Sequence, residues 1–98
     1  MEYNEFVEEL EIGLQDQMKG ETAFSIQAQT TQKNGEDHKE ILYSRAGDTW
    51  GLPLPTEEAY DDFLEGIPIE KIAQKMVKLM KRYTEVVPRK WKMEPAFL

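Results

Sequence analysis

Basic side chains recur at helical spacing near the end of the chain. Lys71, Lys75, Lys78 and Arg82 stand three or four positions apart, so on a helix they form one stripe opposite the apolar side. A tryptophan flanked by further basic residues follows the stripe. The candidate interaction surface therefore comprises Lys71, Lys75, Lys78, Arg82, Arg89, Lys90, Trp91 and Lys92. Cations beside an aromatic ring suit phosphate contacts and base stacking, whereas the simplest alternative is a solvated helix face whose cations complement the helix dipole.

A metal site has little support in the sequence. His38 is the only histidine, and on a strand it shares a face with Glu40, two positions away. Two such ligands do not hold zinc tightly, and the chain has no cysteine to complete the set. A solvated histidine just after a turn is the simpler interpretation. We therefore predict no metal site and no cofactor.

Catalytic constellations are equally weak. Ser25 and Ser44 are the only serines, and no Gly-x-Ser-x-Gly elbow accompanies them. Carboxylates are numerous between residues 57 and 65, but that spacing places them on the outside of a short helix. A chain of 98 residues is not expected to enclose a cleft in which two carboxyls acquire different environments. The sequence predicts a protein that is not an enzyme.

Charge is divided by position along the chain. Residues 1–70 hold 17 Asp/Glu against 4 Lys/Arg, whereas residues 71–98 hold 2 against 8, within a net charge of −7. Such a division favours a polyanion-binding patch, or mutual attraction between the two parts, or simple solubility. The acidic part would repel phosphates, which disfavours a dedicated nucleic-acid binder. With no apolar run long enough for a membrane and no signal-peptide pattern, we expect a soluble cytoplasmic protein.

The elements that must position these residues follow from hydrophobic periodicity. Apolar residues from Tyr3 to Met18 have helical spacing that leaves Ile12 outside the apolar arc, with an irregularity expected at Gly13. Residues 22–29 then alternate, placing Phe24, Ile26 and Ala28 on one face of a strand.

The middle of the chain predicts turns and further strands. Asn34-Gly35 favours a tight turn before a second strand, on which Ile41 and Tyr43 share a face. Residues 46–48 suggest another turn, and residues 50–54 a short third strand that Pro53 confines to an edge.

The last third returns to helical spacing. Thr56 is the expected N-cap of a short helix that buries Tyr60, Phe63 and Leu64 and ends at Gly66. Pro68 suits the first position of another helix. The apolar side of that helix is predicted to be Ile69, Ile72, Ala73, Met76, Leu79, Met80 and Tyr83.

Together these elements predict a two-layer α+β fold: an N-terminal helix, an antiparallel sheet of two or three strands, and two C-terminal helices. The helices are expected to cover one face of the sheet. We assign residues 1–88 to a single α+β domain and residues 89–98 to a tail or linker toward a following region.

The order and spacing of several short patterns resemble a known family. The patterns are Tyr3-Asn4-Glu5-Phe6, Lys33-Asn34-Gly35, Ile41-x-Tyr43, Gly47, and the aromatic helix at Tyr60 that ends at Gly66. They are similar to the N-terminal region of a family of unknown function found mainly in Gram-positive gut anaerobes. The resemblance implies a domain of a longer bacterial protein and brings no catalytic residue. Pro68 departs from the family, in which a capping residue such as serine is more usual.

These observations favour a non-catalytic module that binds another protein, or another domain of its own chain, through the basic segment. The alternative is a polyanion binder, in particular for single-stranded nucleic acid, that uses the same helix and Trp91. No membrane partner is expected. The sequence does not indicate whether the protein is a monomer or an oligomer.

Overall fold

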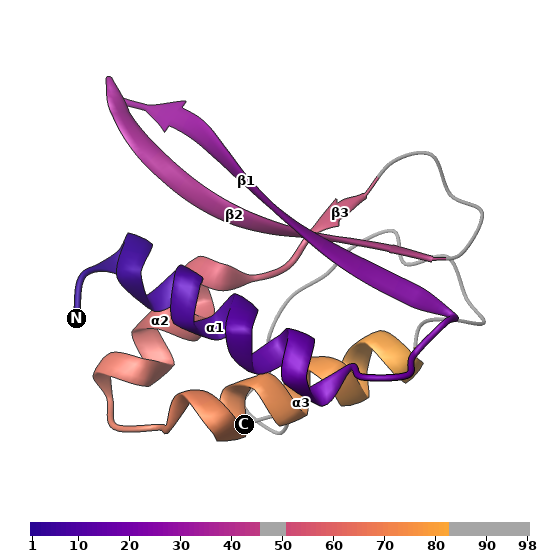
Figure 1. Ribbon diagram of the computed structural model, residues 1–98. Helices are drawn as coiled ribbons and strands as arrows, with labels where there is room; N and C mark the ends of the chain where they lie inside the picture. The colour runs from indigo at the N-terminus through magenta and orange to yellow at the C-terminus, as the bar shows by residue number, and fades with distance from the viewer. Residues whose placement is uncertain (46–50, 83–98) are drawn as a thin grey trace.

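The computed structural model describes residues 1–45 and 51–82 and shows an α+β fold of two layers. In chain order the elements are α1 (Tyr3–Gln17), β1 (Phe24–Lys33), β2 (Glu36–Arg45), β3 (Leu52–Pro53), α2 (Thr56–Leu64) and α3 (Ile69–Arg82). The antiparallel sheet has the order β1-β2-β3. Figure 1 shows the three helices on one side of the sheet, with the tip of the β1–β2 hairpin projecting beyond them. The predicted fold class is confirmed.

The hairpin has the turn and register that the sequence predicts. Asn34 and Gly35 both have positive φ, 55° and 79°, as a two-residue turn between twisted strands requires. Lys33 pairs with Glu36, and the ladder continues to Phe24 opposite Arg45. The predicted third strand is shorter than expected, because β3 comprises only Leu52 and Pro53, and Pro53 does lie in an edge strand.

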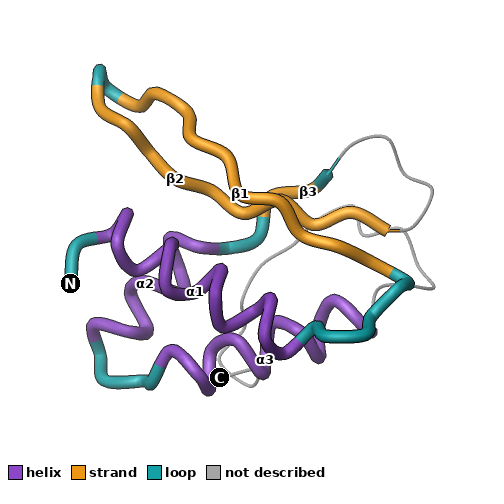
Figure 2. Tube along the Cα trace, viewed as in Figure 1, coloured by secondary structure: helices purple, strands orange, loops and turns teal. Residues whose placement is uncertain are grey.

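The core lies between α1, α3 and the helix-facing side of the sheet. Its fully buried side chains include Phe6, Leu10 and Leu14 of α1, and Ile41 of β2. Gly13 does not disturb α1, which is continuous; it faces Ala73 of α3, and an added Cβ would lie 3.5 Å from that side chain. Ile12 is 63% exposed, as predicted. Ala28, expected to be buried, is exposed: it borders an open hollow beside Val7, Glu8 and Glu11 of α1. Figure 2 shows how the hairpin tip extends past the helices.

Three details of the C-terminal helices differ from the sequence prediction. Thr56 is the first residue of α2 rather than its N-cap, a position that Pro55 occupies. Leu64 is 62% exposed, since it lies about a third of a turn from the contact made by Ala59 and Phe63. In α3, Val77 is buried whereas Leu79 is half-buried, which rotates the apolar side slightly. Residues 46–50 and Tyr83, also named in the predictions, lie outside the described residues.

The first turn of α1 covers the edge of β2 beyond the end of β3. The Leu54 amide donates to the Ile41 carbonyl at 2.8 Å, and one step further along β2 the Tyr3 hydroxyl donates to the Lys39 carbonyl at 2.7 Å. The Asn4 carboxamide accepts from the Lys39 amide and donates to the Asp37 carbonyl, both at 3.0 Å. Side chains of α1 thus take the place of a neighbouring strand, which satisfies backbone groups that an edge would otherwise expose.

Replacement Tyr3→Phe should destabilise the fold by about 1–2 kcal/mol, because it removes the donor to Lys39 and the 2.8 Å contact with the buried Thr56 hydroxyl. Replacement Tyr60→Phe is the matched control. Its hydroxyl donates to the Met1 carbonyl at an exposed place, so its loss should cost less than about 0.5 kcal/mol. Urea unfolding of both variants measures the difference, and equal costs would contradict the edge-covering role of Tyr3.

Candidate functional site

The basic stripe of α3, defined as Lys71, Lys75, Lys78 and Arg82, lies on the side of the helix opposite its buried residues. The buried side consists of Ile72, Ala73, Met76, Val77 and Met80. None of the four cations forms an ion pair with a carboxylate of the described residues. Partial desolvation lowers the pKa of Lys75, and the neighbouring charges of Lys71 and Lys78 lower it further. The stripe is therefore a concentration of positive charge that the rest of the described fold leaves uncompensated.

The remaining candidates fall outside the described residues. Arg89, Lys90, Trp91 and Lys92 belong to the segment 83–98, as does the boundary at residue 88. Their part in the interaction surface and the assignment of residues 89–98 stay predictions.

Attraction between α2 and α3 does not account for the charge division. The sequence suggested that Asp61, Asp62 or Glu65 of α2 faces a lysine of α3, yet no such ion pair forms within residues 51–82. Burial raises the pKa of Asp62, and the carboxylates of Glu65, Asp61 and Glu58 raise it further. Asp62 is thus surrounded by negative charge rather than paired with a lysine of α3.

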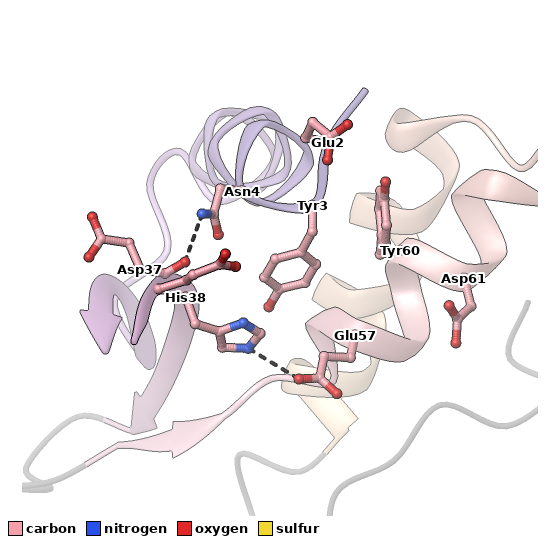
Figure 3. Close-up of a pocket in the computed structure, with 9 residues that line it drawn as sticks. Glu2, Tyr3, Asn4, Asp37, His38, Glu57, Tyr60 and Asp61 are labelled. Carbon is pink, nitrogen blue, oxygen red and sulfur yellow. Dashed lines mark hydrogen bonds and ion pairs between the residues drawn. The ribbon is translucent and has the colours of Figure 1, made fainter. Parts of the chain in front are cut away.

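A second candidate is an open hollow around His38, which the sequence did not predict for so small a domain. Its volume is about 480 Å³. Figure 3 shows that its walls come from the start of α1, the hairpin and α2. The lining residues are Glu2, Tyr3, Asn4, Glu36, Asp37, His38, Glu57, Tyr60 and Asp61.

Three side chains of the hollow join the three elements to one another. The Tyr3 ring of α1 stacks on the His38 ring of β2, with centroids 4.6 Å apart and planes inclined by 9°. His38 Nε2 lies 3.1 Å from Oε1 of Glu57 in α2 (Figure 3), and Lys33 Nζ lies 2.9 Å from the same oxygen. Positions 3, 33, 38 and 57 are far apart in the chain, so no local spacing pattern could have indicated this cluster.

The protonation states and existing hydrogen bonds of Tyr3 and Glu57 limit the chemistry that this cluster could perform. Burial raises the pKa of Tyr3, so the phenol stays protonated, and its hydroxyl is engaged with Lys39 and Thr56. The hydrogen bond from Lys33 lowers the pKa of Glu57, with a further contribution from the charge of Lys33 and from His38, which makes this carboxylate a weak base. A general acid or base needs a pKa near the working pH, and neither group has one. The contacts are those of a joint between elements.

The other chemistry-bearing residues are not brought together. His38 contacts Glu57, whereas Glu40 accepts a hydrogen bond from Gln29 at 2.8 Å, so the two do not act as a pair. Ser25 and Ser44 lie opposite each other near the other end of the hairpin. In the described part of the chain, no three His, Asp or Glu side chains are grouped as ligands for a metal ion.

Comparison of the chain with protein-family models, with curated proteins and with solved structures gave no match. The resemblance to an uncharacterised bacterial family therefore stays a prediction. In residues 1–45 and 51–82, none of the helices has the length and apolar character needed to cross a membrane.

The lowered pKa of Glu57 predicts a specific pH dependence of stability. Because the folded state favours the ionised carboxylate, its contribution is present above the unfolded pKa and is lost as the pH falls through the folded pKa. Replacement Glu57→Gln should cost about 0–1 kcal/mol near pH 7, since both partners are half exposed. That cost should shrink as the pH falls below the unfolded pKa and vanish once it is below the lowered pKa of the folded state. Urea unfolding across pH 3–7 measures the trend.

Replacement Asp62→Asn is the control of opposite sign. The raised pKa means that ionised Asp62 disfavours the fold, so the amide should leave stability equal or slightly higher near pH 7. Any difference should disappear in acid, where both states are protonated. If both variants showed the same pH trend, the pKa directions assigned to the two carboxylates would be wrong.

Proposed function

We propose that the protein is a non-catalytic interaction module that binds an acidic surface of another protein or domain through the basic stripe of α3. The observation that carries this proposal is the uncompensated charge of the stripe. Lys71, Lys75 and Lys78 have no carboxylate partner in the described residues, although the chain holds 19 Asp/Glu against 12 Lys/Arg. Three or four like charges held close together gain stability when an acidic partner neutralises them.

A binding role fits the state of the titratable groups better than catalysis does. The stripe is carried by a helix whose other side is fixed in the core by Met76 and Met80, so its cations are held on a rigid support. In contrast, Tyr3, His38 and Glu57 are engaged with one another between the layers. If the resemblance to a longer bacterial protein holds, the acidic partner is a neighbouring domain of that chain.

The alternative is binding of single-stranded nucleic acid by the same stripe. Phosphates would meet the same cations, and the affinity would fall steeply with salt. We favour a protein partner because the whole chain has a net charge of −7, and its field opposes a long polyanion more than a compact acidic patch.

Replacement of both Lys75→Glu and Lys78→Glu should abolish binding of a fluorescent glutamate-rich peptide, with the melting temperature nearly unchanged. Lys78 is exposed and Lys75 is half-buried at the margin of the apolar side, and neither makes an ion pair within the described residues. Fluorescence anisotropy at 20 and 150 mM salt, with an oligodeoxythymidine as second probe, measures both modes.

Lys19→Glu is the matched control for the single change Lys78→Glu. It removes one exposed lysine at the end of α1 and alters the net charge equally. Peptide binding that is lost only in the α3 variants supports the proposed surface, and tight binding of the oligonucleotide alone supports the alternative. Failure of the protein to bind either probe at 20 mM salt would contradict both.

A further inference from the structure

The outer edge of β1 is the second unusual surface of the molecule. β1 is ten residues long and terminates the sheet, since β2 is its only neighbour in the described sheet. Between Ser25 and Gln32 every side chain is exposed except those of Ile26 and Thr31, which are half-buried. A long edge of this kind is a template for pairing with another strand, and most proteins protect it with charge, proline or a bulge.

The backbone groups that face outward can be assigned from the register. Lys39 and Ile41 direct their backbone groups away from β1, toward α1 and Leu54, so they are non-hydrogen-bonded partners of Thr30 and Ala28. The alternation then turns the amides and carbonyls of the even-numbered residues outward: Phe24, Ile26, Ala28, Thr30 and Gln32. No hydrogen bond to these groups from outside the β1–β2 ladder is found within the described chain.

From Phe24 to Gln32 this edge carries no charged side chain. The sequence from Phe24 to Gln32 contains only Phe, Ser, Ile, Gln, Ala and Thr, in a chain whose composition is 32% charged. Charge first returns at Lys33, which is paired with Glu57. A strand without charge can lie against an identical strand without like-charge repulsion, which a charged edge could not do.

The opposite edge of the sheet, formed by β2 and β3, is covered. Leu54, Tyr3 and Asn4 hydrogen-bond to outer backbone groups of β2 between Asp37 and Ile41, and β3 is two residues long and contains Pro53. Because the described sheet leaves only the β1 edge free, the addition of one strand edge to another stops at two copies. Two free edges would instead give an open fibre.

We propose that two copies of this chain associate through β1, antiparallel to each other about a two-fold axis at Ala28. In this register Ala28 meets its own counterpart, Ile26 meets Thr30, and Phe24 meets Gln32. All five outward-facing residues then exchange backbone hydrogen bonds. On the opposite face of the sheet Gln27 lies against Gln29 of the other copy. The product is one continuous six-stranded sheet with both helix layers on the same side.

The association is expected to be weak and to strengthen with salt. Edge pairing buries less surface than the roughly 1,600 Å² of a standard stable interface, so dissociation constants on the order of 10–500 μM are expected. Each copy has a net charge of −7, and salt screens the resulting repulsion. Binding through the α3 stripe has the opposite salt dependence, which separates the two interactions.

The register can be tested with a pair of double variants that differ at one position. Gln27→Lys with Gln29→Lys places lysine against lysine twice across the axis, whereas Gln27→Glu with Gln29→Lys places glutamate against lysine twice. Within one molecule position 27 faces Leu42, and a lysine at position 29 faces Glu40 in both variants. Sedimentation equilibrium between 10 μM and 1 mM at 150 mM salt should show at least about tenfold weaker dimerisation for the first variant than for the second.

Amide hydrogen exchange supplies a readout at single residues. The Gln27 and Gln29 amides bond to β2 in the monomer and should be protected at all concentrations, whereas the Ala28 and Thr30 amides should gain protection as the dimer forms. Dimerisation with this alternating pattern and the charge-pair difference supports the proposal. A protein that stays monomeric at 1 mM, or a dimer in which the two variants behave alike, overturns it.

Discussion

The structure depends on the hydrogen bonds that satisfy the outer edge of β2. Between Asp37 and Ile41 this strand has backbone groups that no full-length neighbouring strand reaches, since β3 is only two residues long. Tyr3, Asn4 and Leu54 supply the missing partners. Because two of these partners are side chains at consecutive positions of α1, the helix cannot slide or rotate against the hairpin without leaving backbone groups unpaired. The edge therefore fixes the register between the helix layer and the sheet.

The need to satisfy the edge of β2 also explains why Tyr3, His38 and Glu57 are engaged with one another. To reach the Lys39 carbonyl, Tyr3 must lie across His38, and the Tyr3–Thr56 contact then draws the start of α2 alongside. Glu57 follows Thr56 directly and meets His38 and Lys33 from that position. A phenol, an imidazole and a carboxylate in one hollow resemble catalytic parts by residue type. Their geometry instead follows from the need to close an edge, and it leaves the phenol neutral and the Glu57 carboxylate firmly ionised.

The sequence predicted the elements well because their signals are local. The periods of α1 and β1, the Asn34-Gly35 turn and the glycine stop at Gly66 need no knowledge of distant residues. The errors lie where distant contacts decide. Thr56 has the residue type of an N-cap, yet its hydroxyl is used by Tyr3, 53 positions away. Leu64 has the residue type of a core position, but α2 meets the core through Ala59. The basic stripe could be predicted because it depends only on the helical spacing of residues in one segment. The His38 hollow instead arises from three elements that no sequence pattern links.

The two surfaces argued for binding face different ways, which makes them compatible. The basic stripe is on the side of α3 turned away from the core, whereas β1, uncharged from Phe24 to Gln32, forms the outer edge of the sheet layer. An acidic chain repels its own copies over most of its surface, so a neutral strand is the place where self-association costs least. A dimer formed there would carry two basic stripes at a fixed separation. A weak contact between one stripe and an acidic partner then becomes a stronger bivalent one wherever that partner presents two acidic patches at a matching distance.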